Sequence, residues 1–213
     1  MTNTCRFCAI RDGSNVFGTA DGKLAQDHGY FAIPSIGSLV EGWTLVVPNE
    51  HCVSLRANYN EAAFRAFVGD VAGVVSGVYG PLVAFEHGSN VEGSLTGCGT
   101  DHAHLHLVPR SALAISDLDQ SHLQFVAVDR ADIVKTVGHS EYLAFFPDIV
   151  NAPEQAIVAL LNAPVSQFFR RLIGGKLGLG ADQIDYRRAP RLEVASATVA
   201  ALQPAFEYVG AHG

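Results

Sequence analysis

Three histidines stand at alternate positions in the segment Asp101-His-Ala-His-Leu-His-Leu-Val-Pro109: His102, His104 and His106. Side chains two residues apart leave the same face of a β-strand, so a strand here would present three imidazoles together and turn the intervening alanine and leucine toward a core. Imidazole is largely unprotonated at neutral pH and is a competent nucleophile toward phosphorus. The pattern predicts a histidine-lined reactive face.

A glycine-rich loop, Gly88–Thr100, leads into these histidines. Glycines leave backbone N–H groups bare, and a run of such groups can surround a phosphate. We therefore expect Gly97, Gly99 and Thr100 to bind a phosphate group of the substrate.

The four cysteines are Cys5, Cys8, Cys52 and Cys98. A Cys-x-x-Cys pair indicates metal or redox chemistry when the chain is cytosolic. Redox pairs usually follow a strand, and no strand is predicted before Cys5, so metal binding is the favoured interpretation. The alternative is a frayed terminus that binds nothing.

Fourteen basic and 21 acidic residues give a net charge of −7, which argues against general nucleic-acid binding. Six of the basic residues nevertheless gather between positions 170 and 191: Arg170, Arg171, Lys176, Arg187, Arg188 and Arg191. This cluster is either a local anion site or a solvated helix face with a loop.

The 213 residues suit one domain, or a core with a large appendage, and 48% apolar residues are enough to bury a core and exclude extensive disorder. The longest uncharged runs, Val71–Phe85 and Gln155–Phe169, are shorter than the roughly 18 residues of a membrane helix, and each contains proline. The first residues lack the basic-then-apolar pattern of a signal peptide, so we expect a cytoplasmic protein that does not span a membrane.

Apolar runs and turn residues predict the elements that position the histidines. Strands are expected at 29–34, 43–48, 82–86, 101–109, 123–128 and 142–146. Helices are expected from a cap at Asn60 to Gly80-Pro81, and at 153–161, 165–173 and 193–202. If the helix around 165–177 is amphipathic, it carries Arg170 or Arg171 to the rim of the histidine face, where a guanidinium would pair with a substrate anion. A solvated helix or a dimer contact is the alternative.

The segment His102-Ala-His-Leu-His106-Leu-Val resembles the signature of the histidine triad (HIT) superfamily, in which apolar residues follow three alternating histidines. Glu41-Gly-Trp-Thr-Leu-Val-Val-Pro-Asn-Glu-His51 is similar to a second motif of that superfamily, a strand with glycine, an apolar run, proline and histidine. The helix and the strand ending at Glu86 fall in the same order. The resemblance covers roughly residues 5–110.

The resemblance implies an α+β fold with an antiparallel sheet and a packed helix over 1–110, commonly dimeric. Beyond the resemblance, we expect residues 111–213 to form a mixed α/β C-terminal extension packed on this core; a single domain over 1–213 is the alternative. It also implies hydrolysis or transfer at the α-phosphorus of a nucleotide conjugate. By that resemblance His104 attacks phosphorus and becomes a transient nucleotidyl-histidine, and His106 contacts a phosphate or leaving-group oxygen.

Zinc-containing bacterial members of the superfamily use a Cys-x-x-Cys pair, the histidine after the second strand and the first triad histidine. The resemblance therefore implies one structural zinc ion held by Cys5, Cys8, His51 and His102, a tetrahedral Cys₂His₂ set. Cys52 and Cys98 are not expected to be ligands.

The chain departs from the superfamily's pattern at three places. Trp43 stands where a histidine often follows the glycine, Gly97-Cys98-Gly99 replaces a Gly-Gln-Ser type of sequence, and Glu86 replaces an amide residue. Since a carboxylate repels phosphate, Glu86 is expected either to point away or to bind sugar hydroxyls.

Two other functions remain open from the residues. His102, His104 and His106 together would suit the catalytic metal of a metallohydrolase, although barrel enzymes with His-x-His pairs are normally longer than this chain. The chain would otherwise be a nucleotide-binding module without catalysis.

Overall fold

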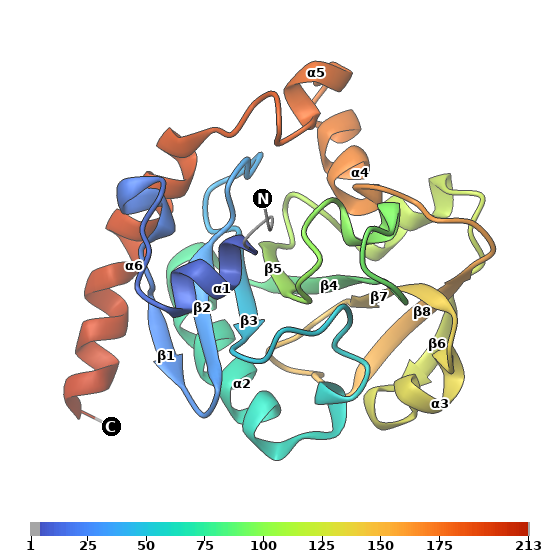
Figure 1. Cartoon of the computed structure of the whole chain (residues 1–213), viewed down its shortest axis with the longest axis horizontal. Coiled ribbons are helices and arrows are strands. Elements are labelled where there is room, and N and C mark those ends of the chain that lie inside the picture. Colours follow the sequence, from blue (N-terminus) through green and yellow to red (C-terminus); the bar gives the residue numbers. More distant parts are fainter. Residues whose placement is uncertain (1–4, 213) are drawn as a thin grey trace.

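The structure is a computed structural model that describes residues 5–212. The prediction that the first residues do not form a signal peptide falls partly on residues 1–4, which lie outside the described residues. The centre of the structure is one sheet in the order β1-β2-β3-β5-β4-β7-β8-β6, with every neighbouring pair antiparallel. Helices lie around this sheet (Figure 1). The predicted α+β class with an antiparallel sheet is confirmed.

The strands are β1 Ala25–Asp27, β2 Tyr30–Pro34, β3 Thr44–Pro48, β4 Leu82–Gly88, β5 Leu105–Pro109, β6 Val126–Asp129, β7 Glu141–Phe146 and β8 Gln155–Leu161. The α-helices are α1 Arg6–Arg11, α2 Ala62–Tyr79, α3 Ile133–Val137, α4 Phe168–Lys176, α5 Ala181–Ile184 and α6 Leu192–His212. Short 3-10 turns connect several of them, including Gly18–Asp21 and Leu95–Gly97.

The two faces of the sheet bury two different cores, because side chains alternate along each strand. Ala84 and Leu105 belong to the core that also contains the apolar stripe of α2. Phe85 and Val108 belong to the core on the opposite face, which also contains Phe7 of α1. The residues of β4 and β5 are thereby sorted between a structural face and the face that carries the predicted histidines.

Helix α2 is long and apolar enough, by length and composition alone, to cross a membrane. Its side chains Phe64, Phe67, Val71 and Val75 are nonetheless buried in the core beneath the sheet. This is the placement of a core helix, and it is consistent with a soluble protein.

The strands after residue 110 continue the same sheet, because β7 pairs with β4 and β8 pairs with β7. Figure 1 shows α6 beside β1 and β2, and it shows α4 and α5 at the opposite end of a connection that returns to α6. Helix α6 is tied to the turn before β3 by a hydrogen bond of 3.1 Å from Gly42 N to Thr198 Oγ1. The division at residue 110 stays a prediction.

The segment 153–161 was expected to be helical, and this prediction is wrong: Gln155–Leu161 forms strand β8. A short apolar run has no periodicity that separates a buried strand from a buried helix. Pairing with β7 on one side and β6 on the other decides the conformation, through partners such as Ala144↔Val158 and Val126↔Val158.

Four predicted boundaries also move. The strand expected at 123–128 begins at Val126, and the strand expected at 101–109 begins at Leu105. Before Leu105 the backbone bonds elsewhere, since Ala103 N donates to the Cys52 carbonyl oxygen at 2.6 Å. The helix expected from 165 starts at Phe168, because Gln167 has a left-handed conformation with φ of 52°. Helix α6 runs beyond the expected 193–202.

Candidate active site and metal site

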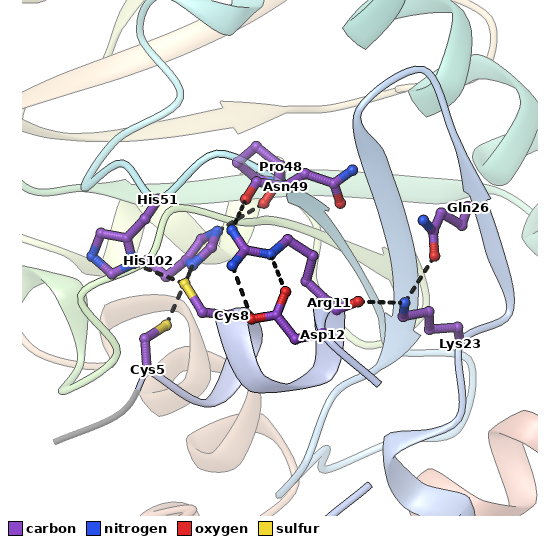
Figure 2. Close-up of polar contacts among 10 residues, drawn as sticks. All are labelled: Cys5, Cys8, Arg11, Asp12, Lys23, Gln26, Pro48, Asn49, His51 and His102. Carbon is purple, nitrogen blue, oxygen red and sulfur yellow. Dashed lines mark hydrogen bonds and ion pairs between the residues drawn. The ribbon is translucent and has the colours of Figure 1, made fainter. Parts of the chain in front are cut away.

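Four residues from three separate segments bring their metal-binding atoms within 4.8 Å of one another: Cys5, Cys8, His51 and His102. Figure 2 shows both cysteines at α1 facing the two imidazoles. Cys5 Sγ lies 3.3 Å from His102 Nδ1, and Cys8 Sγ lies 3.3 Å from His51 Nδ1 and 3.6 Å from His102 Nδ1. The four residues predicted to bind metal are therefore close enough to do so.

Each of the two imidazoles turns one ring nitrogen toward the thiols. His102 Nε2 lies 2.8 Å from the Pro48 carbonyl oxygen, which only accepts, so Nε2 carries the proton and Nδ1 keeps its lone pair toward the thiols. Among the described residues His51 has no such hydrogen bond from Nε2, which lies 3.6 Å from a Glu92 carboxylate oxygen, but its Nδ1 also faces a thiol. Metal-bound histidines usually donate their other N–H to a carbonyl or carboxylate, as His102 does.

The distances also suit a tetrahedral ion. Zinc bonds of about 2.3 Å to sulfur and about 2.0 Å to nitrogen give a sulfur–nitrogen edge of about 3.5 Å. The separations of 3.3 and 3.6 Å lie on either side of that value. Burial lowers the pKa of His102 to about 4, so its imidazole is neutral and able to bind. The donor set fits zinc, with all four positions taken by protein.

A pocket of about 410 Å³ lies beside this group, on the face of the sheet opposite α2. Its wall includes His104, His106, Gly99 and Thr100, all predicted as site residues. Gly97 is not in the wall: it ends the turn Leu95–Gly97 and is buried behind it. Helix α1 joins the metal group to the pocket, because Phe7 meets the rings of His102 and His104 edge-on at 5.6 and 5.2 Å.

His104 is fixed in one tautomer by the backbone of its neighbour. Its Nδ1 lies 2.8 Å from the His102 carbonyl oxygen, which requires a proton on Nδ1 and leaves Nε2 with a lone pair. Nε2 has no partner among the described residues and is not enclosed by them, so it faces the pocket. Burial lowers the pKa of His104 to about 4, which keeps the ring neutral at pH 7.

His106 has the opposite tautomer. The indole N–H of Trp43 only donates, and it lies 2.9 Å from His106 Nδ1, so a neutral His106 carries its proton on Nε2. Burial lowers the pKa of His106 well below its usual value, and the ring stacks on Phe85 at 4.5 Å. A bare nitrogen of His104 and an N–H of His106 thus belong to neighbouring rings, whose centroids are 4.6 Å apart.

Glu86 points away from the pocket, the first of the two outcomes expected for it. Its carboxylate accepts hydrogen bonds from Leu55 N at 2.6 Å, Tyr59 OH at 2.6 Å and Tyr142 OH at 2.7 Å. It is 1% exposed, and burial raises its pKa. Glu86 therefore ties the segment after His51 to the sheet and does not repel a phosphate.

The two predicted arginines have different positions. Arg170 lines the pocket, with Cζ 4.8 Å from the Trp43 ring centroid, and it donates to the Gly37 carbonyl oxygen. Burial lowers its pKa to about 10, so it remains charged at pH 7. Arg171 is exposed and outside the pocket wall, because the next residue of a helix points in another direction.

Several pocket residues were not predicted from the sequence. His87 extends the pocket face of β4 two residues beyond Phe85, a position that strand alternation alone would have revealed. Burial lowers its pKa to about 3, and its Nε2 is buried without a partner among the described residues. Arg6, Phe7 and Tyr186 reach the pocket from distant segments, and nothing local in the sequence signals this. Arg187 also reaches it, and its membership of the basic cluster was the only signal.

Comparison with solved structures finds similarity to a HIT family protein from Bacillus anthracis str. 'Ames Ancestor'. The two chains are 23% identical, the match covers 51% of this chain and 74% of the other, and the TM-score is 0.39. No protein-family model and no curated protein matches this chain. The functional interpretation therefore rests on the site itself.

Proposed function

We propose that this protein is a HIT-type hydrolase or transferase that acts at the α-phosphorus of a nucleotide conjugate. The observation that carries the proposal is the pair of tautomers in the pocket. The His102 carbonyl holds the proton of His104 on Nδ1, so Nε2 is a neutral nucleophile. Trp43 holds His106 with N–H on Nε2, so a hydrogen-bond donor stands beside that nucleophile.

In the proposed reaction His104 Nε2 forms a bond to phosphorus, and the bond from phosphorus to the leaving group breaks with its electron pair. The His104 ring becomes cationic in this step, and its Nδ1–H bond to the His102 carbonyl strengthens as the charge develops. Water or another acceptor then attacks phosphorus and regenerates His104. His106 Nε2–H and the backbone at Gly99 and Thr100 bind the phosphate oxygens; the role predicted for Gly97 is to shape that loop from behind.

The metal has a structural role in this proposal. Cys5, Cys8, His51 and His102 would hold a zinc ion, which would supply rigidity and no open coordination position. His102 would then serve twice, since its side chain binds the metal and its carbonyl oxygen orients His104. The metallohydrolase alternative is disfavoured, because the Nδ1 atoms of His102, His104 and His106 face three different partners.

The homodimer implied by the resemblance and the cytoplasmic location expected from the first residues both stay predictions.

The proposal is tested by replacing His104. The His104→Asn variant should lose at least about 1,000-fold in kcat on adenosine diphosphate conjugates and adenosine phosphoramidates, because the nucleophile is gone. His122→Asn is the matched control, since His122 is exposed and outside the pocket wall. Turnover by His104→Asn at the rate of the control would refute the proposal.

A further inference from the structure

The pocket has a second polar wall beyond His106, built by residues far from the histidine motif. We propose that Arg170 and Arg187, with Tyr186, form a second anion site that binds a phosphate of the leaving group. The substrate is then a conjugate with a diphosphate link, and a phosphoramidate or ester with a neutral leaving group is a poor one. This inference rests on the proposed function, because it places the leaving group relative to His104.

The charges of the pocket wall support the assignment. Three guanidinium groups line it, from Arg6, Arg170 and Arg187, and no aspartate or glutamate does so within the residues described. Arg6 is neutralised by an ion pair with the buried Asp21. Neither Arg170 nor Arg187 has an ion-pair partner in the described part of the chain. Asp185, outside the pocket wall, interacts electrostatically with both arginines without forming a direct ion pair. Two cations without a direct ion pair thus share one pocket of a protein with net charge −7.

Arg170 lines the same pocket as His104. It is only 6% exposed, and one of its N–H groups goes to the Gly37 carbonyl oxygen. A guanidinium has five N–H donors, and none of the remaining ones of Arg170 is enclosed without a partner, so they face the pocket. Trp43 contacts both groups: Arg170 Cζ lies 4.8 Å from the centroid of its ring, and the indole N–H donates to His106 Nδ1.

Arg187 is held to the loop that precedes the histidines. Its Nη2 donates to the Cys98 carbonyl oxygen at 3.1 Å, and Tyr186 OH donates to the same oxygen at 2.8 Å. Gly99 adopts φ of +78°, which favours glycine, and the Arg187 guanidinium lies where a Cβ at this position would stand, so a larger residue would displace it. The C-terminal segment therefore adds its cations directly to the loop that lines the phosphate pocket.

The chemistry of guanidinium groups indicates what they bind. Arginine pairs with phosphate through two parallel charge-assisted hydrogen bonds, each stronger than a neutral one. A neutral leaving group would instead leave a buried cation without a counterion, which is unfavourable. A second phosphate next to the α-phosphate satisfies Arg170 and Arg187 together.

Binding of ADP and AMP, measured by titration calorimetry without added divalent cations, tests the site. ADP should bind wild-type protein at least about tenfold more tightly than AMP, because charge-assisted hydrogen bonds contribute about 1.5–3 kcal/mol. Arg187→Ala should reduce the ratio of ADP affinity to AMP affinity at least about fivefold, mainly because ADP binds more weakly. Arg188→Ala is the control, since its exposed guanidinium pairs with Asp182 outside the pocket; it should keep the wild-type ratio.

The variant Arg170→Lys gives a second test. It retains the positive charge but removes the planar guanidinium group, and Arg171→Ala is its control. The ratio should fall in Arg170→Lys and not in Arg171→Ala. No ADP preference in wild type, or an unchanged preference in both Arg187→Ala and Arg170→Lys, would overturn the inference. The same titrations with His104→Asn separate the two proposals, because loss of turnover reports on the nucleophile and the ADP preference reports on the anion site.

Discussion

The polar side chains on the two faces of the sheet at β4 and at the start of β5 have opposite environments. On the α2 face, the Glu86 carboxylate accepts three hydrogen bonds from protein donors and has no access to solvent. On the other face, His104 Nε2 stands in a pocket without a partner among the described residues. A buried polar group whose bonds are all made within the protein is structural, whereas one left with a free atom in a pocket is available for chemistry.

The largest expected effect concerns the structural face. Glu86→Ala leaves the hydroxyls of Tyr59 and Tyr142 and the Leu55 N–H without their acceptor, and should lower the free energy of unfolding by about 3 kcal/mol or more. Urea denaturation at pH 7 measures this. Folded Glu86→Ala protein should keep KM for its substrate within about twofold, since Glu86 lies on the face of the sheet opposite the pocket. If the free energy of unfolding falls by less than about 1 kcal/mol, the hydrogen bonds of Glu86 are not structural.

The metal group is expected to have the next largest effect. Elemental analysis of freshly purified protein should find zinc at about one ion per four-ligand site, and Cys8→Ser should lose it and about 2 kcal/mol or more of stability. Because α1 carries Phe7 into the pocket, the fluorescence of Trp43, the chain's single tryptophan, should also change on metal loss. Cys52→Ser, outside the ligand group, is the control. Protein without metal before any chelation would contradict this prediction.

A smaller, pH-dependent effect is expected at His87, which faces His106, Phe85 and Phe169 and lies near His104, Arg170 and Arg171. Burial lowers its pKa to about 3 in the folded protein, against about 6.5 in an unfolded chain. The unfolded state therefore binds more protons as pH falls from about 6.5 toward 3, and the folded state loses stability over that range.

The variant His87→Phe removes this penalty, so its stability advantage over wild type should grow by about 2 kcal/mol between pH 7 and pH 5. Thermal unfolding of both proteins at several pH values measures the difference. An advantage that is constant with pH would mean that His87 is not held neutral by burial.

The smallest expected effect concerns the tautomer of His106. Trp43→Phe removes the donor to His106 Nδ1 but keeps an aromatic ring, and kcat should fall about tenfold, the value of one hydrogen bond of about 1.4 kcal/mol. The ¹⁵N shifts of the His106 ring in wild type and variant measure the tautomer directly. A normal kcat together with a changed tautomer would remove His106 Nε2–H from the proposed mechanism.

The sequence predicted best what depends on local spacing. The strands near 29–34, 43–48 and 82–86 and helix α2 follow from short apolar runs and periodicity, and the structure has all of them. The grouping of Cys5, Cys8, His51 and His102 joins distant segments and was implied by the resemblance, and the structure brings these four residues together. Strand β8 was missed because its conformation depends on partners distant in the chain.

The sequence predicted the basic cluster from which the pocket takes two arginines, but it did not distinguish the arginines that line the pocket from those that do not. Arg187 is one of six clustered basic residues, and only the hydrogen bond to Cys98, 89 positions away, distinguishes it from Arg188. Arg170 and Arg171 are equivalent in sequence, and the exact start of α4 at Phe168 decides which one is buried. Long-range packing of this kind leaves no local pattern to read.

The central claim is that His104 Nε2 attacks phosphorus, and a trapped intermediate tests it most directly. The protein is mixed with an adenosine diphosphate conjugate, quenched in alkali within milliseconds to seconds, and digested for mass spectrometry, because phosphoramidate bonds to histidine survive alkali better than acid. The account predicts an added adenylyl group on the peptide that contains His104, located at that residue and absent from His104→Asn. Turnover with no adduct on any histidine, or an adduct at His102, His106 or His87 instead, would contradict it.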